Sequence, residues 1–179
     1  WTGRWAGWSP AVLRPGSTQE VARVVRLARQ HGVGLVPQGG NSGLVAGATP
    51  LEGGVVVDLR RLDHLGPVDA ASAQVTAGAG VALADLQAHV AAAGLVFGVD
   101  LGARDTATVG GMVATNAGGL HVLRHGAMRA QLLGVEAVLG TGAVVQANMA
   151  DPEAVRTAVD RGDRQNFAKF RRHRFHHPY

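Results

Sequence analysis

Apolar residues in the first third of the chain recur first at helical spacing and then as short runs. Valines and an alanine after Ser17 fall on one face of a helix. Ser17 and Glu20 have the spacing of a capping box, and Gly32 is a typical stop signal. The runs 33–37 and 54–59 are β-branched and bounded by Gly or Pro, as buried strands are. The pattern predicts a helix between Ser17 and Gly32 and two buried strands.

With the short run VLRP before the helix as the first strand, the order of strand, helix, strand, loop and strand predicts an α/β unit with a right-handed crossover. The loop PQGGNSGLVAG, Pro37 to Gly47, then lies at the C-terminal end of a strand, where open sheets bind ligands. Glycine leaves main-chain amides uncovered, so such a loop can wrap a pyrophosphate. The alternative is a tight turn made of tolerant residues.

A second unit follows, with a strand at 74–78, a helix at 81–93 and a hairpin at 132–146. The segment 97–126 has neither a helical nor a strand period and contains seven glycines. A long irregular stretch inside a compact domain is usually functional. The expected fold class is therefore α+β, built from small α/β lobes.

Composition narrows the functional classes. The 179 residues include no cysteine, which excludes disulfides and thiolate sites. The absence of cysteine fits a cytoplasmic location. No apolar stretch approaches the roughly 20 residues of a membrane helix, so we expect no membrane span. The first residue is Trp1, and we expect residues to have been lost before it. The net charge of +4 lies mostly in 151–179, with seven basic residues against four acids; nucleic-acid binding through this basic segment stays an alternative.

Two common nucleotide motifs are excluded. No G-x-G-x-x-G opens a helix with an acidic residue at the end of a following strand, and no G-K-[ST] occurs in the chain. A dinucleotide would require a different fold.

Three stretches together resemble one family: PQGGNSGLVAGATP, DLGARDTATVGGMVATNAGGLHVLRHG and LLGVEAVLGTGAVV. In order and spacing, from Val12 to Val145, they resemble the PCMH-type FAD-binding domain of the vanillyl-alcohol oxidase superfamily. The branch that they resemble contains D-2-hydroxyglutarate, D-lactate and glycolate dehydrogenases. The resemblance implies an FAD-binding domain at 10–147, with a first lobe at about 10–66 and an incomplete second lobe at about 67–147.

The resemblance also implies the cofactor contacts. Residues of the first loop would hold the pyrophosphate or continue along the cofactor, and residues of the second segment would line its other side. The first set is Gly39, Gly40, Asn41, Ser42, Gly43, Gly47 and Ala48. The second set is Asp100, Thr106, Gly110, Gly111, Thr115, Asn116, Gly118 and Gly119. For Asn116 the alternative is a turn residue that caps its own backbone.

The flavin is expected to be bound non-covalently. Some relatives tether it through a histidine near the position of Asn41, whereas this chain has no histidine between His31 and His64. The chain departs from the family pattern twice: His125 replaces the usual tyrosine, and Gly98 replaces a proline. Either change is expected to loosen the isoalloxazine end of the site.

His121 and His125 are four residues apart, which is a spacing for two metal ligands on one helical face. No third ligand lies nearby in the sequence, and the local glycine density argues against a helix, so no metal is expected. His125 as a catalytic base stays an alternative to a hydrogen-bonding role. No catalytic residue is assigned.

The family oxidises a D-2-hydroxy acid to the 2-oxo acid by hydride transfer to flavin. The resemblance ends near Gln146, before any substrate domain, so the fragment is expected to be inactive alone; its electron acceptor is unknown. The competing class is a non-catalytic FAD-binding subunit of a glycolate-oxidase-like complex of several chains.

The basic tail 148–179 does not match the family. It predicts a helix at 152–160, with Asp151 as N-cap. Its end, FAKFRRHRFHHPY, is interpreted as out-of-frame sequence, a solvated tail or a partner site. Without the missing family strands, we expect an unpaired sheet edge in the second lobe and poor solubility.

Overall fold

The computed structural model describes residues 5–148 and 167–174. Its first sheet is parallel and has the order β1-β3-β2, from β1 (Val12–Leu13), β3 (Val55–Asp58) and β2 (Leu35–Gln38). The crossover between β1 and β2 is helix α1 (Thr18–Gln30). These elements confirm the α/β order predicted from the hydrophobic pattern, and the glycine-rich loop does follow the C-terminal end of β2.

Local signals determine both ends of α1. The Ser17 side chain accepts a hydrogen bond from the Glu20 amide at 3.2 Å, as predicted for an N-cap. The Glu20 carboxylate accepts from the amide of Gly16 at 2.7 Å, one residue before the donor of an ideal capping box. Gly32 has a φ of 64°, which explains why glycine stands after the last turn.

The second sheet is antiparallel and has the order β4-β7-β5-β6. Its strands are β4 (Gln74–Ala77), β7 (Phe167–Arg174), β5 (Leu132–Val138) and β6 (Val144–Asn148). The predicted hairpin is confirmed as β5 and β6. β7, from the segment interpreted as an unmatched tail, pairs with both β4 and β5 and so joins them, while β4 and β6 form the two edges of the described sheet. The helix predicted at 152–160 lies outside the described residues.

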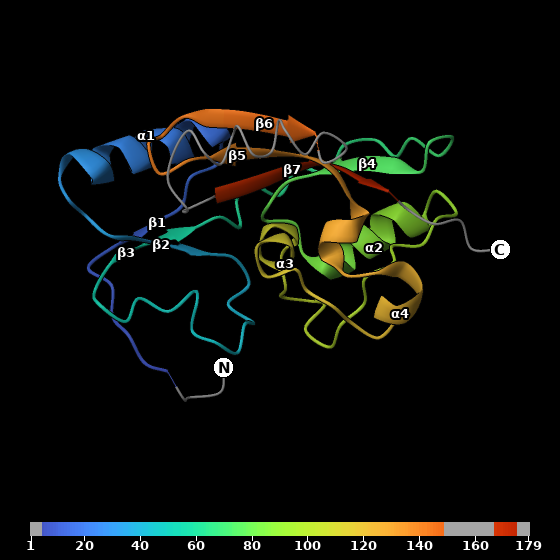
Figure 1. The fold of residues 1–179 in the computed structure, drawn as a ribbon, viewed down its shortest axis with the longest axis horizontal. Coiled ribbons are helices and arrows are strands. Elements are labelled where there is room, and N and C mark those ends of the chain that lie inside the picture. Colours follow the sequence, from blue (N-terminus) through green and yellow to red (C-terminus); the bar gives the residue numbers. More distant parts are fainter. Residues whose placement is uncertain (1–4, 149–166, 175–179) are drawn as a thin grey trace.

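Helices cover one face of this second sheet (Figure 1). Helix α2 (Leu83–Ala91) buries Leu83, Leu86 and Val90, and Gly94 follows with a φ of 74°, as the spacing predicts. Helix α3 (Val109–Thr115), helix α4 (Val122–His125) and the 3-10 turn η1 (Met128–Gln131) come next.

The prediction of an irregular 97–126 segment, with no helix around its histidines, was therefore wrong at α3 and α4. Two glycines at the start of α3 interrupt the apolar period in the sequence. In the fold the buried side chains of Val109, Met112 and Val113 stabilise the helix against the main core.

The two lobes share part of their core. A cluster of buried side chains joins α1 to β3 and to the end of β5, through Val21, Val57 and Val138. The hydroxyl of Thr18 also donates to Glu136 of β5 at 2.7 Å. Figure 1 shows α1 alongside the β5–β6 hairpin. The lobe boundary near 66 stays a prediction.

Candidate functional site

The two glycine-rich segments meet at the junction of the lobes. A Cβ atom on Gly39 would overlap the side-chain oxygen of Thr108, and a Cβ on Gly40 would overlap the main-chain carbonyl of Thr106. Neither glycine has a positive φ. Glycine is therefore needed at both positions for close approach of two chain segments rather than for backbone conformation.

The loop after β2 exposes a run of main-chain donors. Among the described residues, no hydrogen bond uses an amide from Gly39 to Gly43 as its donor. Asn41 lies in the left-handed region with a φ of 50°, so the direction of successive amides changes within the loop. A run of amides without internal acceptors, at the end of a parallel strand, has the chemistry of an anion site.

The outer part of this loop is open. A Cβ on Gly43 or Gly47 would meet no atom within 4 Å. The Gln38 side chain donates to the carbonyl of Ala48 at 2.9 Å and ties the return of the loop to the end of β2. A hollow of about 260 Å³ lies here and includes Asn41, Gly43 and Ala48 in its lining. These small residues leave room for a ligand next to the free amides.

The start of α3 differs from the first loop because its amides are already used. Gly110 donates to the carbonyl of Ala79 at 2.8 Å, and Gly111 donates to the Thr108 hydroxyl at 3.4 Å. Thr108 is the buried N-cap of the helix. Gly110 and Gly111 can therefore contribute close approach to a ligand, but their amides already have acceptors.

The polar side chains at the end of α3 also have partners within the chain. The Thr115 hydroxyl donates to the carbonyl of Gly111 at 3.0 Å. Asn116 is the C-cap, with φ 51° and ψ 52°, and its side-chain oxygen accepts from the Arg129 amide at 3.0 Å. The alternative reading of Asn116 as a turn residue thus describes its backbone, although its oxygen bonds to a distant residue.

Asp100 anchors the remainder of the second segment. Its carboxylate accepts from Gln87 at 3.2 Å and pairs with Arg104 at 3.5 Å. Its main-chain carbonyl accepts from Leu120 at 2.8 Å, and Gly119 packs so closely that a Cβ would overlap that carbonyl oxygen. Gly118 lies next to this contact and is exposed.

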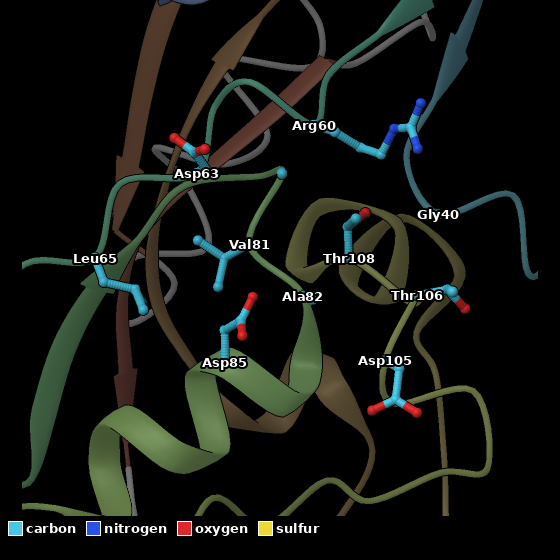
Figure 2. A pocket seen from close by; sticks show the side chains of 11 residues that line it. Gly40, Arg60, Asp63, Leu65, Val81, Ala82, Asp85, Asp105, Thr106 and Thr108 are labelled. Carbon is cyan, nitrogen blue, oxygen red and sulfur yellow. The ribbon is translucent and has the colours of Figure 1, made fainter.

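A pocket of about 510 Å³ opens beside the lobe junction (Figure 2). It connects Gly40 of the first loop with Thr106 and Thr108 of the second segment. Thr106 is exposed, and its hydroxyl donates to the carbonyl of Ala103 at 3.3 Å. The charged residues of the lining are Arg60, Asp63, Asp85 and Asp105. Carboxylates accept hydrogen bonds from hydroxyl groups and repel phosphate, so this pocket suits a neutral, hydroxyl-bearing group.

An ion pair between the buried Asp58 and exposed arginines borders this pocket and was not predicted from the sequence. Asp58, at the end of β3, accepts from the Arg60 guanidinium at 2.9 and 2.8 Å and from the Arg60 amide at 3.0 Å. Arg14 approaches the same carboxylate at 3.2 Å. The hydrogen bond from Arg60 lowers the pKa of Asp58, against the opposing effect of burial, and Asp58 raises the pKa of Arg60. The sequence signal for this ion pair was an aspartate at the end of an apolar strand, two residues before an arginine.

His121 and His125 do lie one helical turn apart, with ring centroids 6.3 Å apart. Within residues 5–148, no three His, Cys, Asp or Glu side chains form a group that could hold a metal ion. No helix among these residues is long and apolar enough to cross a membrane.

Comparison with known proteins places these features in context. The family described as "FAD binding domain" matches residues 9–148. A D-2-hydroxyglutarate dehydrogenase of Xanthomonas citri pv. viticola is 39% identical over 150 residues, which cover 84% of this chain and 32% of that protein. A putative mitochondrial D-lactate dehydrogenase of Schizosaccharomyces pombe is 37% identical over 145 residues, covering 81% and 28% respectively.

The fold is also found among solved structures. That of 6-hydroxy-D-nicotine oxidase from Arthrobacter nicotinovorans superposes with a TM-score of 0.80 at 26% identity, over 99% of this chain and 38% of that one. The architecture is that of the PCMH-type FAD-binding domains, as the sequence predicts. The chain spans less than a third of the length of the two dehydrogenases. One of them is mitochondrial, so the similarity does not support the expected cytoplasmic location.

Proposed function

The chain belongs to the FAD-binding domain family, and from this membership we propose that the loop after β2 binds the pyrophosphate of FAD through its main-chain amides. The observation that carries the proposal is the run of amides from Gly39 to Gly43, which have no acceptor among the described residues. Ser42 adds a hydroxyl donor. The open positions Gly43 and Gly47 leave space for the phosphate oxygens and the adjoining parts of the cofactor.

At the start of α3 the second segment supplies a close-packed wall, because the amides of Gly110 and Gly111 already have acceptors. In this proposal Gly110, Gly111, Gly118 and Gly119 allow the approach of the cofactor, and Thr106 offers a hydroxyl. Asp100, Thr115 and Asn116 shape the wall through the bonds that they already make. The acidic pocket beside Gly40 accepts a hydroxyl-bearing part of FAD, since its carboxylates would repel the pyrophosphate.

We propose that FAD is bound non-covalently. The loop from Gly39 to Pro50 contains no histidine and the chain contains no cysteine, so the loop has no side chain suited to a flavin linkage. Retention of the cofactor then depends on the hydrogen bonds and contacts described above.

For the whole protein we propose the oxidation of a D-2-hydroxy acid to the 2-oxo acid. Bound FAD supplies the hydride acceptor. The support is the similarity to relatives named as D-2-hydroxyglutarate and D-lactate dehydrogenases. Because the chain spans less than a third of their length, no substrate-binding residue is assigned to it, and residues 1–179 alone are expected to show no turnover. A cytoplasmic location stays a prediction.

A titration of the chain with FAD tests the cofactor site, with quenching of flavin fluorescence as the readout. We expect FAD to bind, ADP to compete and riboflavin to bind much more weakly, because the amides recognise the pyrophosphate. Acid precipitation should release all of the flavin. Failure of the folded chain to bind FAD would contradict the proposal.

A negative charge introduced at Gly43 tests where the pyrophosphate binds. Gly43→Asp should weaken FAD binding by about a thousandfold, since like charges ~4 Å apart near a surface repel by roughly 4 kcal/mol. Gly34→Asp is the matched control, because Gly34 also has open space around it but lies before β2, at the opposite end of that strand. Equal losses in both variants would place the pyrophosphate elsewhere.

A further inference from the structure

The chain leaves α3 through a tight turn that leads into the proposed cofactor segment. A helix leaves its last four carbonyls without intrahelical donors. Here the amides of Asn116 and Ala117 return to the carbonyls of Val113 and Met112 at 3.1 and 2.8 Å. The left-handed conformation of Asn116 turns the chain toward 117–119.

Arg129 makes three hydrogen bonds at this turn. Its Nε donates to the carbonyl of Val113 at 3.2 Å, and its Nη2 donates to the carbonyl of Ala114 at 2.9 Å. Its main-chain amide donates to the side-chain oxygen of Asn116 at 3.0 Å. One residue of η1 therefore bonds to three residues at the end of α3, namely Val113, Ala114 and Asn116.

We propose that Arg129 is a positioning residue for the cofactor, acting through the end of α3. Together with Asn116 it forms a latch, which we call the α3 latch. The latch holds one end of 116–119, and the contact of Gly119 with the main chain of Asp100 holds the other. This inference rests on the proposed function, because it is the FAD-facing role of 116–119 that the latch serves.

The chemistry of arginine suits this role. A cation near the C-terminal end of a helix is favourable, and the planar guanidinium reaches two adjacent carbonyls at once. Lysine would retain the charge without this pair of directed bonds. Arg129 is exposed, so its removal should disturb the local geometry more than the global stability.

The role of Asn116 changes accordingly. The sequence resemblance implied a direct contact with the cofactor, but the side-chain oxygen accepts from Arg129. In the latch, Asn116 tolerates the left-handed conformation and provides an acceptor that fixes the start of the turn before β5.

The first test needs no cofactor. Hydrogen exchange of the Asn116 and Ala117 amides is measured in the full chain and in Arg129→Gln. We expect exchange to become about tenfold faster in the variant. Arg26→Gln is the control, since exposed Arg26 donates to the carbonyl of Gly142 at 2.9 Å, far from α3. Arg26→Gln should lose the same kind of bond, from an arginine side chain to a main-chain carbonyl, but should leave the exchange rates of the Asn116 and Ala117 amides unchanged.

The second test measures the affinity for FAD and the environment of the bound flavin. We expect Arg129→Gln to raise the dissociation constant of FAD about tenfold and to change the visible circular dichroism of the bound flavin, with Arg129→Lys intermediate and Arg26→Gln like wild type. Asn116→Gly, which keeps the left-handed backbone and removes the acceptor, should act in the same direction. The effects of Asn116→Gly and Arg129→Gln should be less than additive in the double variant.

Unchanged exchange in Arg129→Gln would overturn the latch. Faster exchange with unchanged FAD affinity and dichroism would overturn its positioning role. If wild type itself fails to bind FAD, the proposed function fails, and the exchange data still decide whether Arg129 orders the turn.

Discussion

Gly98 packs directly against the side chain of His125. A Cβ atom on Gly98 would lie 2.7 Å from the Cβ of His125 and 3.3 Å from the side-chain oxygen of Gln131. The side-chain amide of Gln131 also donates to the carbonyl of His125. Gly98 and His125 are the two positions at which the sequence resemblance implies a departure from the family pattern. Their contact indicates that the missing side chain at Gly98 provides the room that His125 occupies.

Gly98→Ala should therefore destabilise the protein by about 1–3 kcal/mol, the usual effect of overpacking a buried site. The Cβ of His125 is fixed to the backbone and cannot rotate away. Urea unfolding measures the change. Gly102→Ala is the control, because a Cβ there meets nothing within 4 Å, and its effect should stay within about 0.5 kcal/mol. Similar stabilities of the two variants would contradict the contact.

Gly40→Ala should lower the melting temperature, because its Cβ would overlap the main-chain carbonyl of Thr106 and force the two glycine segments apart. A destabilisation of about 1–3 kcal/mol is expected. Gly43→Ala, whose Cβ has open space, should leave the melting temperature nearly unchanged. Thermal unfolding of both variants without FAD separates packing from cofactor effects, and an equal response would argue against the close approach at Gly40.

Thr108→Val should cost about 1 kcal/mol of stability, because it removes the oxygen that accepts from the Gly111 amide at the start of α3. The valine keeps the volume of the buried side chain. Thr108→Ser keeps the hydroxyl and should retain the cap. Chemical denaturation of the two variants distinguishes the bond from the packing: a serine variant as stable as wild type is expected, and one that is no better than valine would speak against the cap.

Asp58→Asn should change how stability depends on pH. The hydrogen bond from Arg60 lowers the pKa of Asp58 in the folded state. Its stabilising contribution is therefore complete above the pKa of the unfolded chain, about 4, and is lost as the pH falls through the lower pKa of the folded state. Wild type should lose this part of its stability below about pH 4, and the variant should lose less there.

At neutral pH the same variant should be less stable by about 1–3 kcal/mol, because a carboxylate that accepts several bonds is replaced by a neutral amide. Both arginine side chains are 57% exposed, which keeps the effect modest. Urea unfolding between pH 7 and about pH 3 measures both effects. Parallel pH profiles of variant and wild type would show that Asp58 is not the titrating group.

Sequence patterns predicted those parts of the fold that depend on near neighbours. The cap at Ser17, the stops at Gly32 and Gly94 and the β5–β6 hairpin are each specified within a few residues, because periodicity and turn chemistry act over one or two turns of chain. The position of the glycine loop after β2 followed from the same reasoning.

The tertiary structure decided what depends on residues far apart in the chain. Helix α3 depends on burial against a distant core, which outweighs the glycines in its first turn. It also decided that the amides from Gly39 to Gly43 have no acceptor in the described part of the chain while those of Gly110 and Gly111 do, and that Arg129 reaches Asn116. A hydrogen bond between distant residues exists only when the whole chain has placed both partners, and no local pattern records where the second one will be.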